Sequence, residues 1–395
     1  MPHPNSPIGN GLRISTRLDS IQPFRVMEVQ RRALELERQG IRVIHMEIGQ
    51  PDFRPPPAIL KAGADAILNR PLGYSDSLGI PELREALSDY YQARLGVSVP
   101  KDRLVITSGA SGALLLTLAA LVNPGEEVLM ADPSYPCYRH FVHLFGGTAR
   151  CIPTVDHNAY QLTLADIKEN WSARTRGVII ASPSNPTGTI IDFAELKAIA
   201  KWIADQGGYL IADEIYQELV YEGAKNSALS LGEDVFVINS FSKYFCMTGW
   251  RLGWAVIPEQ FMALIEKLAQ NIAICAPVPA QYAALAGFSD ESLRTLDAHC
   301  HEYRRRRDFV LPRLRAMGFD IPITPSGAFY VYAGCRNFST DSTSFAQDVL
   351  EQAAVALTPG SDFGSFRAEQ FVRFSYTRSL EELDIGLSRL EKFLS

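Results

Sequence analysis

The sequence predicts an α/β fold: a large domain with a mostly parallel sheet sandwiched by helices, beside a smaller α+β domain. Two observations lead to this prediction. Between about residues 104 and 240, continuous apolar stretches of strand length alternate with helix-like stretches, and strands that are apolar throughout are typical of a parallel sheet buried on both faces. Beyond about residue 285 this alternation ends, and a long charged helix is followed by a different series of strands.

Composition narrows the class of protein. The 395 residues, 47% of them hydrophobic and 21% charged, are those of an ordinary globular chain. A formal net charge of -6 argues against a nucleic-acid binder. No apolar run is long enough to span a bilayer, and residues 1–10 lack the apolar core of a secretion signal. The six cysteines are scattered without a CxxC pair, so we expect reduced thiols, no metal site and a cytoplasmic protein.

The first elements are expected outside the alternating region. Residues 1–15 lack periodicity and predict an extended arm. Apolar residues at helical spacing predict a helix over residues 26–39. A short strand is expected over residues 43–48, and a helix over residues 58–68 with Pro57 near its start, where proline is favoured.

The alternating region follows. We expect strands over residues 104–107, 127–131, 177–181, 209–212 and 235–238, and helices over residues 113–122 and 193–206. Asn185, Asp213 and Lys243 come just after three of these strands. In open α/β sheets, ligands bind beyond the carboxyl ends of the strands, so these side chains are expected to converge on one site.

The C-terminal region is predicted to hold the smaller domain. We expect a helix over residues 293–317, a turn entering a strand over 326–332, a strand over 371–376 and a helix over 380–394. We therefore assign residues 1–15 to an N-terminal arm, residues 46–285 to the large domain, and residues 16–45 with 286–395 to the small domain.

The residues around Lys243 indicate a chemistry. Ser240 and Ser242 precede this lysine, and Arg251 follows eight positions later. Most lysines are solvated surface residues, but an amine in an apolar surrounding loses its proton readily, and a neutral amine condenses with an aldehyde. The hydroxyls and the arginine suit a phosphate. An aldehyde and a phosphate on one small molecule suggest pyridoxal phosphate.

A second stretch is consistent with a phosphate site. Ser108-Gly109-Ala110-Ser111-Gly112 lies between a predicted strand and a predicted helix. Small residues at such a turn let backbone N–H groups surround an anion at the helix N-terminus. The alternative is a tight turn with a serine cap, and this stretch alone does not decide between the two.

Five motifs in order resemble those of the fold-type I pyridoxal-phosphate aminotransferases, in the aspartate aminotransferase-like class I/II group. They are Asn185-Pro186-Thr187-Gly188, Asp213-Glu214-Ile215-Tyr216, Ser240-Phe241-Ser242-Lys243, Arg251 and Arg373. The resemblance extends from about Ile48 to Tyr376, nearly the whole chain. It implies the fold of pyridoxal-phosphate-dependent transferases and pyridoxal 5'-phosphate as cofactor.

The resemblance also implies roles for single residues. Lys243 would be the Schiff-base lysine and would carry a proton between the substrate and the cofactor. Asp213 would pair with the pyridine nitrogen and keep it protonated. Tyr216 would hydrogen-bond the phenolic oxygen of the ring together with Asn185. Lys243, Asp213 and Tyr216 are the catalytic residues that we expect.

The remaining site residues are implied in the same way. Tyr135 resembles the aromatic residue that stacks on the ring, and Arg373 would bind the substrate α-carboxylate, assisted by Asn185 and the Gly49 backbone. The phosphate would be held by Gly109, Ala110 and Ser111, by Ser240 or Ser242, and by Arg251. Tyr74 resembles the tyrosine that such enzymes lend to the phosphate of the neighbouring subunit, which implies a homodimer with shared active sites.

Three departures from the family pattern matter here, and two of them bear on the substrate. Aspartate enzymes of the classical subgroup use a second arginine from the partner subunit, but residues 271–277 carry no positive charge here. Ser111 stands where another subgroup has a lysine. Tyr138 stands where some relatives have a histidine behind the cofactor, which leaves the contact of that residue with Asp213 in question. Burying a second carboxylate without a cation would cost several kcal/mol, so neutral or aromatic amino donors are favoured over aspartate.

Three functions remain open at this point. The first is an aminotransferase that moves an amino group from an L-amino acid to a 2-oxo acid by a ping-pong mechanism. The second is a C–S lyase acting by β-elimination on the same fold, which needs the same Lys243, Asp213 and Arg373. The third is a cofactor-binding sensor module of a transcription regulator, which would need a winged-helix domain for which residues 1–15 are too short.

Overall fold

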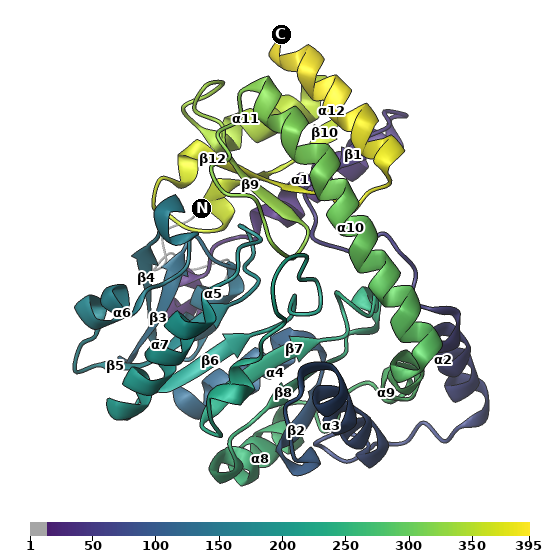
Figure 1. Ribbon diagram of the computed structural model, residues 1–395, viewed down its shortest axis with the longest axis vertical. Helices are drawn as coiled ribbons and strands as arrows, with labels where there is room; N and C mark the ends of the chain where they lie inside the picture. The colour runs from purple at the N-terminus through teal and green to yellow at the C-terminus, as the bar shows by residue number, and fades with distance from the viewer. Residues whose placement is uncertain (1–13) are drawn as a thin grey trace.

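A seven-stranded sheet forms the centre of the computed structural model, which describes residues 14–395 (Figure 1). The strand order is β2-β8-β7-β6-β5-β3-β4, and of these strands only β8 runs antiparallel to its neighbours. The strands are β2 (Leu104–Thr107), β3 (Glu127–Asp132), β4 (Thr148–Pro153), β5 (Thr175–Ala181), β6 (Tyr209–Asp213), β7 (Val235–Ser240) and β8 (Gly253–Val256). The predicted mostly parallel sheet is confirmed.

Alternate residues of the central strands enter two different hydrophobic clusters. Val178, Leu210 and Val237 belong to one cluster, and their neighbours Ile179 and Ile211 belong to the other. Because successive side chains of a strand point to opposite faces, the sheet has a hydrophobic core on each side. This arrangement explains why the strands are apolar at nearly every position.

Helices supply the other half of each core. The helices of the first part of the chain are α1 (Arg25–Arg38), α2 (Pro57–Asn69), α3 (Pro81–Leu95), α4 (Gly109–Leu121), α5 (Cys137–Leu144), α6 (Leu164–Asn170) and α7 (Phe193–Asp205). They are followed by α8 (Met262–Ile272), α9 (Val278–Leu285), α10 (Asp290–Met317), α11 (Ser342–Asp348) and α12 (Leu380–Leu394). Helices α4, α5 and α8 cover one face of the sheet, and α3, α7 and α9 contribute to the core of the other.

Two smaller sheets lie apart from the central one (Figure 1). In one, β11 (Thr358–Pro359), β12 (Phe371–Ser375) and β9 (Tyr330–Gly334) pair antiparallel, and in the other β1 (Ile44–His45) pairs parallel with β10 (Val355–Ala356). The long helix α10 runs from the neighbourhood of α2 and α9 to that of α12 (Figure 1). The domain boundaries given above stay a prediction.

Several elements differ from their predicted extent. The strand expected over residues 43–48 is reduced to Ile44–His45, and α4 begins at Gly109 rather than at residue 113. The small residues of the predicted turn thus form the first turn of a helix. Strand β8 was not predicted, because it is short and starts at a glycine. Residues 1–13 of the predicted arm lie outside the described residues.

Two further observations concern the chain as a whole. None of the helices within residues 14–395 combines the length and the hydropathy that a membrane crossing requires. All six cysteines are free thiols. The cytoplasmic location stays a prediction.

Strand β8 approaches the start of α4 so closely that a side chain does not fit at Gly253. An added Cβ would lie 2.6 Å from the carbonyl carbon of Gly109 and 2.7 Å from the nitrogen of Ala110. These are backbone atoms and cannot rotate away. We therefore expect Gly253→Ala to lower the free energy of unfolding by about 1–3 kcal/mol, as overpacking does.

Urea unfolding of the two proteins measures this difference as a lower midpoint at an unchanged slope. Gly249→Ala is a matched control, because a Cβ at Gly249 meets nothing within 4 Å. Equal midpoints for Gly253→Ala and Gly249→Ala would contradict the predicted overpacking.

Candidate active site

A cavity of about 500 Å³ lies at the carboxyl ends of β5, β6 and β7. It brings together most of the residues that the sequence predicted for one site. The predicted residues that line it are Gly49, Ala110, Ser111, Tyr135, Asn185, Asp213, Tyr216, Ser240, Ser242, Lys243, Arg251 and Arg373.

Two predicted residues do not line this cavity. Gly109 lies directly behind its wall, since a Cβ on this residue would be 2.5 Å from Nη2 of Arg251. Tyr74 is not part of the lining, and 81% of its surface is exposed.

Lys243 follows β7, and its amine is buried in the cavity wall. The Nζ atom donates a hydrogen bond to the carbonyl oxygen of Gly49 at 2.6 Å. Burial lowers the pKa of the Lys243 amine to about 7, the positive charges of Arg373 and Arg251 act in the same direction, and Asp213 opposes them. A large share of this amine is therefore neutral, and so nucleophilic and basic, near neutral pH.

Asp213 ends β6 and is buried. Its Oδ2 accepts a hydrogen bond from the Tyr138 hydroxyl at 2.5 Å, and its Oδ1 accepts one from the backbone N–H of Ile215 at 3.1 Å. Burial raises the pKa of the Asp213 carboxyl above its ordinary value, and these two hydrogen bonds work against the rise. Tyr138 thus makes the contact behind Asp213 that the sequence left in question. Tyr138 makes this contact with Asp213 as a neutral phenol.

Tyr216 pairs with a residue that the sequence analysis missed. Its hydroxyl lies 2.6 Å from the hydroxyl of Tyr330 on β9, which also lines the cavity. Burial and the neighbouring Tyr330 raise the pKa of Tyr216 far above its ordinary value, so this phenol keeps its proton. Tyr330 also explains why residue 49 is a glycine, because a Cβ at Gly49 would lie 1.8 Å from the Tyr330 hydroxyl oxygen.

Arg373 lies on β12 and is buried at the cavity wall. Nη1 donates to Oδ1 of Asn185 at 2.8 Å, and Nη2 donates to the carbonyl oxygen of Glu47. The guanidinium stacks over the Tyr330 ring, 4.3 Å from its centre. Within residues 14–395, no carboxylate lies at ion-pair distance from Arg373, and its buried Nε has no hydrogen-bond partner. A buried cation in this state favours an anionic ligand.

The opposite end of the cavity is suited to a second anion. The first turn of α4 contributes Ala110 and Ser111, and the N-cap residue Ser108 makes no side-chain capping hydrogen bond, which leaves the N–H groups and the positive dipole end of α4 for a ligand. Ser240 and Ser242 lie beside it, with 2.9 Å between their hydroxyl oxygens. Among the described residues, no carboxylate is within ion-pair distance of Arg251 either, and its Nη1 donates to the carbonyl oxygen of Thr248 at 3.0 Å.

One wall of the cavity is apolar. It includes Phe24, Val26 and Met27, and none of these was predicted from the sequence. The start of α1 is held there because the Asp362 carboxylate accepts hydrogen bonds from the N–H groups of Arg25 and Val26, at 2.9 and 3.4 Å. A contact between residues this far apart in the chain leaves no local signal in the sequence. The cations that line the cavity are Lys243, Arg251 and Arg373.

Comparisons with known proteins agree with this geometry. Residues 41–390 match the family described as Aminotransferase class I and II. The chain is 39% identical to the valine–pyruvate aminotransferase of Mycobacterium tuberculosis, over 95% of this chain and 97% of that protein. It is 33% identical to aromatic-amino-acid aminotransferase 2 of Thermococcus litoralis, over 97% of this chain and 98% of that protein.

A solved structure shows the same fold. The aspartate aminotransferase of Thermus thermophilus with maleate superposes with a TM-score of 0.91 at 32% identity, covering 96% of this chain and 99% of that chain. The similar proteins thus include ones named for valine, for aromatic amino acids and for aspartate.

The low pKa of Lys243 leads to a prediction for the ligand-free protein. Titration of the Lys243 amine should show a midpoint near pH 7, where an ordinary lysine titrates near pH 10.4. The amine is charged below this midpoint and neutral above it. Reductive methylation with ¹³C-formaldehyde followed by NMR titration measures the midpoint, and the signal missing from Lys243→Arg identifies the residue. A midpoint near pH 10 would show that the amine is solvated.

Proposed function

Because this chain belongs to the class I and II aminotransferases, which use pyridoxal phosphate, we propose that it moves an amino group from a neutral or aromatic L-amino acid to a 2-oxo acid by a ping-pong mechanism. That it is an aminotransferase follows from the family; the amino donor is our proposal, because relatives act on different amino acids. One observation carries the proposal: a lysine amine with a lowered pKa, a buried carboxylate and an arginine whose Nε has no partner within residues 14–395 face one cavity.

The residues present fit the cofactor. The start of α4, Ser242 and Arg251 would hold its phosphate, the Tyr135 ring would lie against its ring, and Asp213 would pair with a protonated ring nitrogen. We assign the serine contact to Ser242, because the Ser240 hydroxyl is already 3.1 Å from the carbonyl oxygen of Leu252. When bound, pyridoxal phosphate supplies an aldehyde that condenses with amines and a ring that withdraws electrons from the substrate Cα.

Proton transfer is the task we assign to Lys243. With a pKa of about 7, its Nζ would be available as a neutral amine to accept a proton from the substrate Cα and, with the cofactor bound, to deliver it at the C4′ carbon. Burial of the amine excludes water that would compete for this proton. The Tyr216 hydroxyl, held by Tyr330, would donate to the phenolic oxygen of the ring together with Asn185.

Orientation of the substrate is the task we assign to Arg373. The fork of its guanidinium matches a carboxylate, and its Nε has no partner within the described residues. Hydrogen bonds to Asn185 and to the Glu47 carbonyl, and stacking over Tyr330, fix the plane of the guanidinium before a substrate arrives. This preorganisation lowers the entropic cost of binding a substrate.

The apolar wall supports the proposed donor class. With Arg373 assigned to the α-carboxylate and Arg251 to the phosphate, no further arginine lines the cavity within residues 14–395. Phe24, Val26 and Met27 would instead contact the substrate side chain. A second carboxylate against this wall would be desolvated without a cation, at a cost of several kcal/mol, whereas an aliphatic or aromatic side chain gains from the same contact.

The visible spectrum of the purified enzyme tests the proposal. We expect the absorption band of the bound cofactor to fade on addition of valine or phenylalanine faster than with aspartate, and to return with a 2-oxo acid. Lys243→Ala should bind cofactor but lose transamination. Kinetics that require a ternary complex would contradict the ping-pong mechanism, and substantial turnover by Lys243→Ala would contradict the role of the lysine. Pyruvate and ammonia released from cystathionine would indicate the lyase.

We also propose that two copies of the chain share their active sites. Exposed apolar side chains gather at the end of α2 and in the loop after it, with Ile67, Leu68 and Leu72 beside the exposed Tyr74. Such a surface is typical of an interface. Tyr74 is too exposed to serve its own cavity and would instead reach the phosphate in the partner subunit.

The dimer is tested by light scattering and by cofactor affinity. We expect twice the mass of the chain, and we expect Tyr74→Phe to weaken pyridoxal phosphate binding about 10-fold, the loss of one hydrogen bond to a charged group, without changing that mass. A monomeric mass, or an unchanged affinity of a dimeric Tyr74→Phe, would contradict the shared site.

A further inference from the structure

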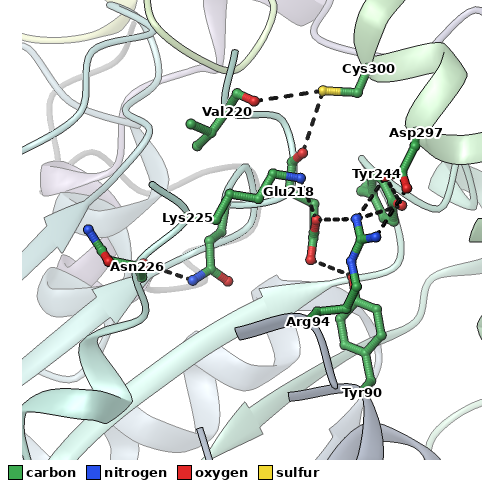
Figure 2. A network of polar contacts seen from close by, with 10 residues as sticks. Tyr90, Arg94, Glu218, Val220, Lys225, Asn226, Tyr244, Asp297 and Cys300 are labelled. Atoms are coloured by element: carbon green, nitrogen blue, oxygen red, sulfur yellow. Dashed lines mark hydrogen bonds and ion pairs between the residues drawn. The ribbon is translucent and has the colours of Figure 1, made fainter. Parts of the chain in front are cut away.

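A second set of polar side chains, drawn in Figure 2, takes no part in lining the active-site cavity. We call it the Arg94 cluster; its members are Tyr90, Arg94, Glu218, Lys225, Tyr244 and Asp297. They come from α3, from the segment after β6, from the segment after β7 and from α10. None of them was singled out in the sequence.

Arg94 is the centre of the cluster. Its guanidinium binds the Asp297 carboxylate with both Nη atoms, at 2.7 and 3.1 Å, and Nη2 also donates to Oε2 of Glu218 at 3.0 Å (Figure 2). The Tyr244 hydroxyl donates to Oδ1 of Asp297 at 2.7 Å. One arginine thus joins α3, α10 and the segments after β6 and β7.

The other contacts complete the charge balance. Oε1 of Glu218 accepts a hydrogen bond from Tyr90 at 2.7 Å, and Oε2 accepts one from Lys225 at 2.8 Å. Two carboxylates therefore face two cations. Burial raises the pKa of Glu218, but Lys225 and Arg94 outweigh burial and hold this pKa below its ordinary value. The carboxylates stay charged, and the cluster is neutral as a whole.

The cluster is connected through the chain to both sides of the cavity. Tyr244 directly follows Lys243, and Glu218 comes two residues after Tyr216. Tyr244 and Glu218 are buried, so their side chains are held along their length as well as at their polar ends. A displacement of either one moves the backbone that carries Lys243 or Tyr216.

We propose that Arg94 and Asp297 are positioning residues for the transamination site: through Tyr244 and Glu218 they hold the two segments that carry Lys243 and Tyr216 in register with each other. The inference rests on the role proposed above for Lys243. It goes beyond that role, because the two residues touch neither the cavity nor anything bound in it. Their effect is on geometry, where an error of about 1 Å at a reacting group can cost on the order of 100-fold in rate.

An arginine of α10 provides the control. Arg313 also forms ion pairs with two carboxylates, those of Asp384 and Glu391 on α12. Its side chain is 22% exposed, against 25% for Arg94. Arg313 contacts neither segment of the active site, so Arg313→Gln removes an arginine that pairs with two carboxylates without loosening Lys243 or Tyr216.

The surroundings of the cluster favour variants that fold. A cavity of about 470 Å³ adjoins it and is lined by Arg94, Lys225 and Asp297 among others. Water can therefore replace part of a shortened side chain. Tyr244→Phe is a second and milder variant, because it removes a single hydroxyl and leaves every charge of the cluster in place.

The experiment has two readouts. For the holoenzyme we expect Arg94→Gln to lower kcat about 10- to 100-fold, with KM for the amino donor within about twofold of the original, because Arg373 is held independently. In the ligand-free protein we expect the NMR titration midpoint of Lys243 to rise toward that of a solvated lysine. Tyr244→Phe should shift the midpoint in the same direction. Tyr244→Phe separates an effect of position from an effect of charge, because the loss of the Arg94 charge would by itself raise the pKa of a nearby lysine.

Arg313→Gln shows the effect of losing an ion-pair group away from the active site. It should lower the melting temperature less than Arg94→Gln, because Asp384 and Glu391 are more exposed than Glu218, and it should leave both kcat and the Lys243 midpoint unchanged. An unshifted Lys243 midpoint in both Arg94→Gln and Tyr244→Phe, in proteins that melt cooperatively, would overturn the proposal. The titration midpoint of Lys243 is measured in the ligand-free protein, so it depends neither on cofactor nor on turnover. The inference can therefore fail while Lys243→Ala still abolishes transamination, and the two failures are told apart.

Discussion

The burial of charge at one edge of the central sheet is the constraint on which the rest of the structure depends. Asp213, Lys243 and Arg373 all line one cavity within the protein, where an unpaired charge is costly. Each meets this constraint differently: Asp213 accepts hydrogen bonds from Tyr138 and Ile215, Lys243 gives up its proton near pH 7, and Arg373 keeps Nε free within the described residues. The same desolvation that opposes folding makes the amine basic and nucleophilic and lets the guanidinium bind a carboxylate.

Around these groups the structure places donors that do not change their charge. Tyr138 and Tyr330 are phenols, and burial raises the pKa of each. A histidine behind Asp213 would titrate near neutral pH, whereas Tyr138 donates the same hydrogen bond over the whole range in which the enzyme would work. Charged pairs appear one layer further out, in the Arg94 cluster, where their full pairing limits the cost of burial. Neutral phenols therefore contact Asp213 and Tyr216, and ion pairs hold the segments that carry Lys243 and Tyr216.

Sequence reasoning predicted the elements that depend on local pattern. The apolar strands of the central sheet and the helices over residues 26–39, 58–68 and 193–206 agree with the structure within a few residues. It missed β8, whose glycine is required by the backbone of Gly109 and Ala110 rather than by its neighbours in the chain. It also missed the apolar wall at Phe24, because the Asp362 carboxylate that holds the start of α1 is more than 300 residues away.

The sequence by itself determined the order of the motifs, the chemical type of each residue at the strand ends and the family to which they point. These depend on residues that are close together in the chain. Only the tertiary structure decided that Tyr138 reaches Asp213, that Tyr330 pairs with Tyr216, and that the Lys243 amine is buried enough to lose its proton. Hydrogen bonds between distant segments and the removal of water depend on how whole layers pack, and no local spacing in the sequence records that packing.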